Sequence, residues 1–307
     1  MKEKHVVIIG AGLGGLECGY ILAKNGMKVT VLEREAQVGG CLQTFRRGAA
    51  LFDTGFHYVG ALGEGESLHT LFSYFDLMSL PWKKLDEDCF DEVVIGEDAF
   101  AFANKHQRFY ERMSARFPKE REGLKKYVDF LKQVGDHIFD SFNLQNEGTF
   151  TNSLFTRSAY EFLNETIKDP LLRKVLSGTS LKMELNAPTL PLYTFAQIND
   201  SFIRSAWRLR GGGMQIADKL VGGIEAMGGE VKTRAIVTYI KEEDGKVVGV
   251  TINDEDYLEA DWVISSTHPA YTVSLVGDSK KMRRIYRDRI ANLDNTFGMF
   301  TANIRLK

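Results

Sequence analysis

The sequence predicts an α/β fold, in which a three-layer domain of the Rossmann type is interrupted by a largely helical α+β domain. Three observations lead to this prediction. The chain opens in the order strand, glycine loop, helix, strand; its middle has mainly helical periodicity; and α/β patterning returns near Arg210. We therefore expect residues 1–63 and 205–270 to form the Rossmann-like domain, and residues 64–204 and 271–307 to form the second domain.

The first elements follow from local patterns. His5–Ile9 is a continuous apolar run, which is typical of a buried parallel strand. After a glycine loop, Leu13–Lys24 has the pattern of a helix, and Asn25-Gly26 ends it. Val29–Leu32 is the next predicted strand, so the chain begins with a β-α-β arrangement.

The middle segment has the marks of helices. Apolar residues recur at helical spacing from Leu124 to Ile138, and Asp169-Pro170 is a typical helix start, with Asp as the N-cap. The later elements are a helix at 214–227, a strand at 230–233, a hairpin of strands 236–241 and 246–252 around Asp244-Gly245, and a buried strand at 262–265.

Composition limits the functions that are open to the chain. It has 307 residues, 44% of them hydrophobic, and a formal net charge of −2, which argues against nucleic acid as a partner. Three cysteines have no spacing typical of metal or disulfides, so we expect no metal site and a cytoplasmic location. No apolar run is long enough to span a bilayer. We interpret the 20 phenylalanines as an aromatic core, with peripheral membrane contact as the alternative.

The strongest motif is Gly10-Ala11-Gly12-Leu13-Gly14-Gly15, which fits G-x-G-x-x-G between a predicted strand and a predicted helix. Gly10 allows the tight turn, Gly12 lets the backbone approach a pyrophosphate, and Gly15 lets the helix pack closely on the sheet. The N-terminus of the helix then offers N–H groups and a partial positive charge to the phosphates. The motif therefore predicts dinucleotide binding.

The residues that follow favour FAD over NAD. Glu33 ends the second strand, where its carboxylate would accept hydrogen bonds from ribose hydroxyls and would repel the 2′-phosphate of NADPH. Val38-Gly39-Gly40-Cys41 comes next, and its paired glycines would let the chain pass close to an extended cofactor. A simple NAD-binding half would instead continue into further βα units.

These segments resemble the phytoene desaturase and carotenoid isomerase-like flavoproteins, and within them the retinol saturase branch. The resemblance is carried by Val31-Leu32-Glu33, Gly39-Gly40-Cys41, Phe52–Gly60, Arg210–Gly213, Asp244–Val250 and Ala260–Ser266. It implies FAD along the Rossmann sheet, with the isoalloxazine near Asp53–Tyr58 and the adenine at the backbone of Val237. It also implies an oxidoreductase that acts on C=C or CH–CH bonds of an apolar isoprenoid, a retinoid-like or carotenoid-like substrate held in the helical domain. The electron donor, NAD(P)H or another carrier, stays open.

The motif and the resemblance together give the candidate site residues. The cofactor-binding candidates are Gly10, Gly12, Leu13, Gly14, Gly15, Glu33, Arg34, Gly39, Gly40, Cys41, Gly55, His57 and Val237. His57 is also the candidate catalytic residue, because an imidazole can move a proton near neutral pH. We expect Asp53 to anchor a turn and Cys41 to be a small packing residue near the cofactor.

The family pattern also raises alternatives. Its members run beyond this length and carry a second glycine-rich segment near their end, and none follows Ser266 here. We therefore expect a chain that is truncated at its C-terminus, with Arg305–Lys307 inside a strand of the substrate domain. A flavin amine or porphyrinogen oxidase is one alternative function. A truncated, non-catalytic nucleotide-binding or interaction protein is another.

Overall fold

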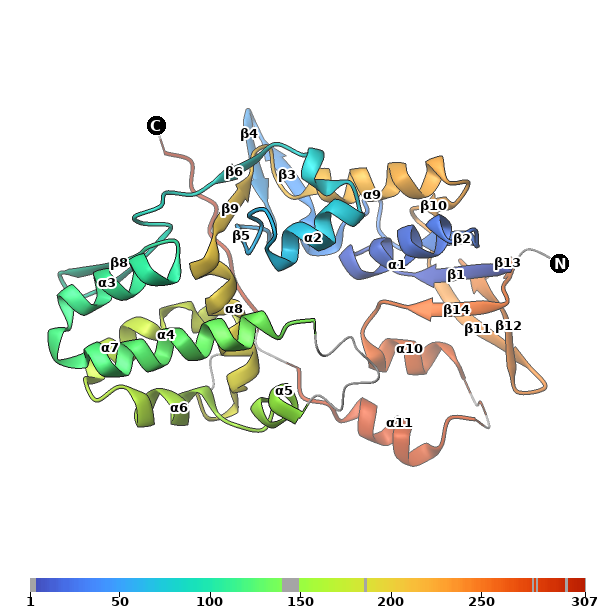
Figure 1. Cartoon of the computed structure of the whole chain (residues 1–307). Coiled ribbons are helices and arrows are strands. Elements are labelled where there is room, and N and C mark those ends of the chain that lie inside the picture. Colours follow the sequence, from blue (N-terminus) through green and yellow to red (C-terminus); the bar gives the residue numbers. More distant parts are fainter. Residues whose placement is uncertain are drawn as a thin grey trace. The chain divides into compact units, whose positions relative to one another are not determined.

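The protein consists of two compact units, shown in a computed structural model (Figure 1). The structure describes residues 4–139, 149–184, 187–277, 279, 281–295 and 298–306. The first unit comprises Met1–His57, Phe75–Leu80 and Gly211–Lys307, and the second comprises Tyr58–Tyr74 and Pro81–Arg210. Residues 271–307 thus group with the first unit, and the assignment of the two units as cofactor and substrate domains stays a prediction.

A parallel sheet forms the centre of the first unit. Its strands lie in the order β10 (Glu230–Lys232), β2 (Lys28–Leu32), β1 (His5–Ile9) and β14 (Trp262–Ser265). The last four residues of β1 and of β2 are buried, as expected of strands that are covered on both faces. These strands confirm the predicted parallel sheet, and β1 has the predicted bounds.

Two further layers cover the sheet. On one face, Ile8 and Val31 of the sheet, Gly19 of α1 (Leu13–Lys24) and Ile224 of α9 (Met214–Ala226) come together. On the other face, Val7 and Ile9 join the apolar cluster of the antiparallel sheet β11-β12-β13 (Val237–Glu243, Lys246–Ile252 and Asp256–Glu259). Because successive side chains of β1 point to opposite layers, the arrangement is the predicted three-layer fold.

Other elements of the first unit were not predicted. They are the hairpin β3–β4 (Thr44–Arg47 and Ala50–Asp53), the short helices η1 (Gly40–Leu42) and η2 (Leu77–Ser79), and the helices α10 (Pro269–Leu275) and α11 (Arg284–Ala291). The strand expected at the end of the chain is wrong for the residues described there. Residues 298–306 are exposed and carry no regular structure, so they lack the pairing that a strand requires.

The second unit is mainly helical with small antiparallel sheets. Its helices are α2 (Ser67–Tyr74), α3 (His106–Arg116), η3 (Pro118–Glu120), α4 (Arg121–Asp136), α5 (Thr149–Leu154), α6 (Ala159–Thr166), α7 (Pro170–Leu176), η5 (Gly178–Lys182), η6 (Ala187–Thr189) and α8 (Leu192–Arg204). Its strands are β5 (Val59–Gly60), β6 (Trp82–Lys84) and β9 (Ala206–Leu209) in one sheet, and β7 (Asp91–Ile95) and β8 (Asp98–Phe102) in a hairpin.

The helical signals in this unit are confirmed. Leu124, Val128, Leu131 and Val134 are all buried on α4, whereas Ile138 lies beyond the end of that helix. Asp169 caps α7, where its Oδ1 accepts hydrogen bonds from the N–H groups of the second and third residues of the helix at 2.8 and 3.3 Å. The core is aromatic, with Tyr127, Phe102, Phe109 and Phe195 among its largest fully buried side chains.

A buried carboxylate joins three helices of the second unit. Asp200 of α8 has a side chain that is 2% exposed, and it meets His106 of α3 at 2.7 Å and Arg204 of α8 at 2.5 Å. Arg204 also reaches Asp136 at the end of α4, at 2.6 Å. A Cβ on Gly135 would overlap the Asp200 carboxylate, so the carboxylate fits here only because residue 135 has no side chain.

We therefore expect Gly135→Ala to destabilise the protein. The added methyl group would displace the Asp200 carboxylate from its two partners, and overpacking or disruption of this kind costs about 1–3 kcal/mol. Thermal denaturation with circular dichroism measures the loss, and Gln133→Ala, at an exposed position of α4, serves as the control. Equal melting temperatures for both variants would contradict the role of Gly135.

Candidate functional site

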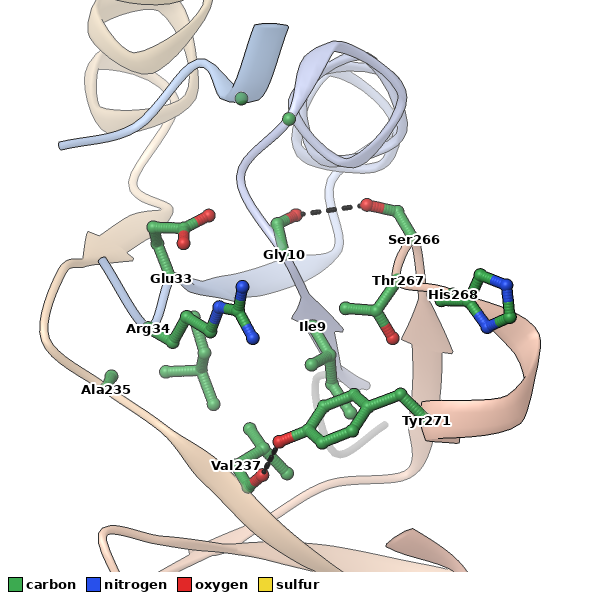
Figure 2. A pocket seen from close by; sticks show the side chains of 13 residues that line it. Ile9, Gly10, Glu33, Arg34, Ala235, Val237, Ser266, Thr267, His268 and Tyr271 are labelled. Atoms are coloured by element: carbon green, nitrogen blue, oxygen red, sulfur yellow. Dashed lines mark hydrogen bonds between the residues drawn. The ribbon is translucent and has the colours of Figure 1, made fainter. Parts of the chain in front are cut away.

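A pocket of about 330 Å³ opens at the carboxyl ends of the parallel strands in the first unit (Figure 2). It is lined by Ile9, Gly10, Gly12, Leu32, Glu33, Arg34, Gly40, Ala235, Val237, Ser266, Thr267, His268 and Tyr271. Ligands of open α/β sheets bind at this edge, and the volume falls within the roughly 300–1,000 Å³ of small-molecule sites. The pocket is therefore the candidate functional site.

The glycine loop between β1 and α1 forms one side of the pocket. Gly10 has φ of +97°, a conformation that suits glycine, and its N–H donates to the Leu32 carbonyl at 2.8 Å. A Cβ on Gly15 would overlap the Gly10 carbonyl oxygen, so α1 can approach the loop only because this residue has no side chain. A Cβ on Gly12 or on Gly14 would meet nothing within 4 Å. The space beside Gly12 is therefore free for a ligand.

The N-terminus of α1 suits an anion. Its N-cap, Gly12, supplies no side-chain hydrogen bond, and no acidic residue lies in the first turn. The N–H groups of that turn have no partner within the helix, and the helix dipole places a partial positive charge there. Together these features provide the environment in which helix termini bind phosphate groups.

Glu33 is buried at the end of β2, with 9% of the residue exposed. Its Oε2 accepts a hydrogen bond from the Ala11 N–H at 2.8 Å, and its Oε1 accepts one from the Glu35 N–H at 3.0 Å. A carboxylate has about four acceptor positions, so both oxygens retain capacity for a ligand hydroxyl. Glu33 thus holds the glycine loop, a role that the sequence did not predict, and its ribose contact stays a prediction.

Arg34 follows on the rim of the pocket. Its side chain is 66% exposed, and its Nε lies 3.1 Å from Glu35 Oε1. In Figure 2 the guanidinium group of Arg34 extends over the pocket from the end of β2. An exposed ion pair of this kind contributes little to stability. The side chain is therefore free to reorient toward a bound anion.

The paired glycines Gly39 and Gly40 lie against the glycine loop that contains Gly12. The Gly39 N–H donates to the Ala11 carbonyl at 2.7 Å, and a Cβ on Gly40 would lie 3.3 Å from Gly12 Cα. Gly39 and Gly40 have φ of +103° and +53°. Segment 39–42 therefore continues from the glycine loop, as an extended cofactor would require.

Cys41 and Gly55 lie together next to this segment. Cys41 is an exposed free cysteine, and a Cβ on Gly55 would lie 3.3 Å from its carbonyl oxygen. That oxygen also accepts a hydrogen bond from Thr54 Oγ1 at 3.2 Å. The two predicted cofactor residues are thus neighbours, although neither lines the pocket.

Asp53 anchors a third group of glycines. Its Oδ1 accepts a hydrogen bond from the Gly213 N–H at 2.7 Å, as expected of a turn anchor. A Cβ on Gly212, where φ is +90°, would lie 3.0 Å from the same oxygen. A Cβ on Gly213 would lie 2.8 Å from Phe56 Cβ, so the loop before α9 fits closely against residues 53–56.

The pocket gathers only part of the predicted site. Gly10, Gly12, Glu33, Arg34, Gly40 and Val237 line it, whereas Leu13, Gly14, Gly15, Gly39, Cys41, Gly55 and His57 do not. His57 is exposed at the end of a segment of the first unit, and its catalytic role stays a prediction. Val237 presents its carbonyl oxygen, which accepts a hydrogen bond from the Tyr271 hydroxyl at 3.0 Å.

Seven of the lining residues are not among the cofactor-binding candidates, although His268, which follows a predicted strand, was considered as a residue that could line the site. They are Ile9, Leu32, Ala235, Ser266, Thr267, His268 and Tyr271. Ser266, Thr267 and His268 directly follow β14, and residues after the carboxyl end of a parallel strand face this crevice, so their position was the available signal. No comparable signal pointed to Tyr271, which lies inside α10.

Two further findings concern all the residues that the structure describes. Among those residues, no helix is both long and apolar enough to cross a bilayer. Nor do three or more His, Cys, Asp or Glu residues of the described ranges come together in a way that could hold a metal ion.

We expect Asp53→Ala to destabilise the first unit by about 1–2 kcal/mol, because the Gly213 N–H would lose its charged acceptor. Asp53→Asn keeps an oxygen at the same position and should lose less. Urea unfolding of the two variants and the parent measures the difference. If Asp53→Asn proved as unstable as Asp53→Ala, the charge or the shape of the side chain would matter more than this hydrogen bond.

Known proteins of related sequence match most of the chain. The all-trans-retinol 13,14-reductase of Danio rerio is 31% identical over 291 residues, which are 86% of this chain and 47% of that protein. The rat protein of the same name is 28% identical over 272 residues, covering 82% of this chain and 44% of its own length. The lycopene-forming phytoene desaturase of a Paracoccus strain is 25% identical over 287 residues, 86% and 54% of the two chains. The chain thus spans about half the length of these relatives.

Solved structures share the fold. A Pyrococcus furiosus protein superposes with a TM-score of 0.68 at 21% identity, covering 95% of this chain and 66% of that one. A redesigned putrescine oxidase gives a TM-score of 0.65 at 18% identity, with coverages of 94% and 63%. The sequence pattern of flavin-containing amine oxidoreductases matches residues 13–295. The resemblance to carotenoid-modifying flavoproteins is confirmed, and the chain belongs to the flavin-containing amine oxidoreductase family.

Proposed function

We propose that the protein is an FAD-dependent oxidoreductase that acts on C=C or CH–CH bonds of an apolar isoprenoid, such as a retinoid or a carotenoid. One observation carries the proposal: the open space beside Gly12 lies between the α1 N-terminus and a buried carboxylate at the end of β2. Relatives named as retinol 13,14-reductases, prolycopene isomerases and phytoene desaturases support the substrate class.

The residues present fit FAD. Gly12 and the first turn of α1 would hold the diphosphate, and Glu33 would accept from the ribose hydroxyls. Gly39, Gly40 and Cys41, which continue from the glycine loop, would lie along the rest of the cofactor. When bound, the flavin supplies hydride transfer to or from carbon.

The chain itself must supply a proton, because reduction of a C=C bond adds a hydride to one carbon and a proton to the other. We propose His57 for this role, since it lies in the segment next to Gly55 and its imidazole can exchange protons with solvent. Tyr58 is a less suitable donor. Burial, together with its hydrogen bond to Asp91 at 2.5 Å, raises the pKa of its hydroxyl well above the usual range. We propose NAD(P)H as the source of electrons.

A second candidate, an amine oxidase, is favoured by the family description and by the likeness to putrescine oxidase. Redox assays separate the two. The purified full chain is tested for flavin released on denaturation. In the absence of oxygen, its reduced form is then offered retinol or a carotenoid as the electron acceptor, and its oxidised form is offered an amine as the electron donor. Reoxidation by a polyene supports the isoprenoid function, whereas a chain reduced by amines alone would be an amine oxidase. Absence of flavin from the protein even after incubation with FAD would reject both.

We expect Gly12→Val to abolish FAD binding while the protein stays folded. Gly12 has φ of −73° and ψ of 177°, which valine also adopts, and the branched side chain would fill the free space beside the loop. Flavin absorbance of the purified variants measures occupancy. Gly222→Val, on an exposed and equally open glycine of α9, is the matched control and should bind FAD normally. Equal flavin content in the two variants would place the diphosphate elsewhere.

We also expect Glu33→Gln to raise the dissociation constant for FAD about tenfold. The amide keeps one oxygen as an acceptor for the loop but loses the charge that strengthens hydrogen bonds from ribose hydroxyls. Fluorescence titration gives the constant, and circular dichroism shows whether the fold is intact. A folded variant that binds FAD as tightly as the parent would argue against the ribose role.

A further inference from the structure

A second pocket lies within the second unit, on helices α6 and α7. Its volume is about 420 Å³, which falls within the roughly 300–1,000 Å³ of small-molecule sites. It is lined by Tyr160, Leu163, Asn164, Pro170, Arg173, Lys174 and Ser177. The charged groups among these residues are both cations, and no acidic residue lines this α6–α7 pocket.

The spacing of the lining residues places them on one face of each helix. Positions 160, 163 and 164 are three and four residues apart on α6, and positions 170, 173, 174 and 177 continue this spacing along α7 and its C-cap. Other side chains of the two helices join the core of the unit and are at most 6% exposed: Phe162, Leu172, Val175 and Leu176. The core therefore holds both helices from one side and leaves the pocket on another.

The link between the two helices is also held in place. Glu120 is 8% exposed, and its carboxylate accepts hydrogen bonds from the N–H groups of Asp169 and Lys168 at 2.7 and 3.2 Å. Asp169 in turn caps α7 through its own carboxylate. The two walls of the α6–α7 pocket are thus fixed by contacts within the chain, without the help of a ligand.

Arg173 carries a charge that lacks an ionic partner. Its residue is half-buried, and its Nη1 donates a hydrogen bond to the neutral side-chain oxygen of Asn164. No carboxylate in the described part of the chain forms an ion pair with Arg173 or with Lys174. A guanidinium has five N–H donors, and partial removal of an unpaired charge from water is unfavourable. An anion in the pocket supplies the partner that the chain does not.

We propose that the α6–α7 pocket binds an amphipathic carboxylate, a small molecule with one anionic end and an apolar chain, such as a fatty acid. The planar guanidinium of Arg173 suits a carboxylate, which it can bind through two parallel hydrogen bonds, and Lys174 adds a second positive charge. The apolar chain lies against Leu163, Pro170 and the ring of Tyr160, which is 55% exposed. This site lies in the other unit from the nucleotide pocket, so the inference does not depend on the proposed function.

Dodecanoate, titrated by calorimetry into the full chain below its micellar concentration, tests the proposal. Dodecyltrimethylammonium has the same chain and a positive head, and we expect it to bind the parent at least tenfold more weakly. Arg173→Met removes the charge but keeps a long side chain, so it should weaken dodecanoate binding about tenfold and leave the melting temperature nearly unchanged. Arg121→Met makes the same change at an exposed position of α4 outside the pocket, and it should leave the affinity unaltered.

Each contrary result overturns the proposal. Equal binding of the two amphiphiles would mean that any apolar chain suffices, and dodecanoate binding that is unchanged in Arg173→Met would place the anion elsewhere. An equal loss in Arg121→Met would show a general effect of charge. Binding to phosphatidylglycerol vesicles that depends on Arg173, without binding of dodecanoate, would identify a membrane contact instead, and binding of neither would reject the site. Flavin content, measured on the same samples, tests the proposed function separately.

Discussion

The close approach of α1 to the end of β1 is the constraint on which the first unit depends. Gly15 lies against the Gly10 carbonyl so closely that no other side chain fits, and this contact sets where the helix begins. The Glu33 carboxylate then fixes the loop from the other side through the Ala11 N–H. The open space beside Gly12 exists because its neighbours are held on both sides. Binding capacity here is thus a by-product of packing.

Three groups of glycines extend this arrangement along the unit. Gly39 and Gly40 pack on the loop, and Gly213 is fastened to the end of β4 through Asp53. At Gly40 and Gly213 an added Cβ would come within 3.3 Å of an atom of a neighbouring segment, so these residues allow a close approach. The groups form a series of contacts from the pocket to residues 53–56. Contacts that extend over this many segments suit a long cofactor more than a compact one.

The elements that sequence reasoning predicted well are those with local signals. The continuous apolar run of β1, the Asn25-Gly26 stop of α1 and the Asp169 cap of α7 each fix an element by its own residues. The hairpins β3–β4 and β7–β8 were missed because their strands are short and only half-buried, which leaves a weak alternation. The strand expected near residue 300 failed for the opposite reason, since alternation alone does not supply a partner.

The site divides in the same way. The glycines and Glu33 stood in a motif, so their positions followed from spacing. Tyr271 and Ala235 reach the pocket only through the tertiary packing of α10 and of the segment before β11. No motif in the adjacent sequence indicates this position. The hydrogen bond that Glu33 accepts from the Ala11 N–H of the glycine loop was missed for a similar reason. A motif indicates which residues meet a ligand but does not indicate which residues hold one another.

The central sheet is assembled from strands that lie far apart in the sequence. β1 pairs with β2 on one side and with β14 on the other, and His5 bonds to Asp261, 256 residues later. During synthesis, the helical residues 81–210 leave the ribosome before β10 and β14 exist. At that stage the edge of β1 that later pairs with β14 has no partner strand, and another nascent chain could add a strand there. This edge of β1 is therefore expected to close only after β14 has been synthesised.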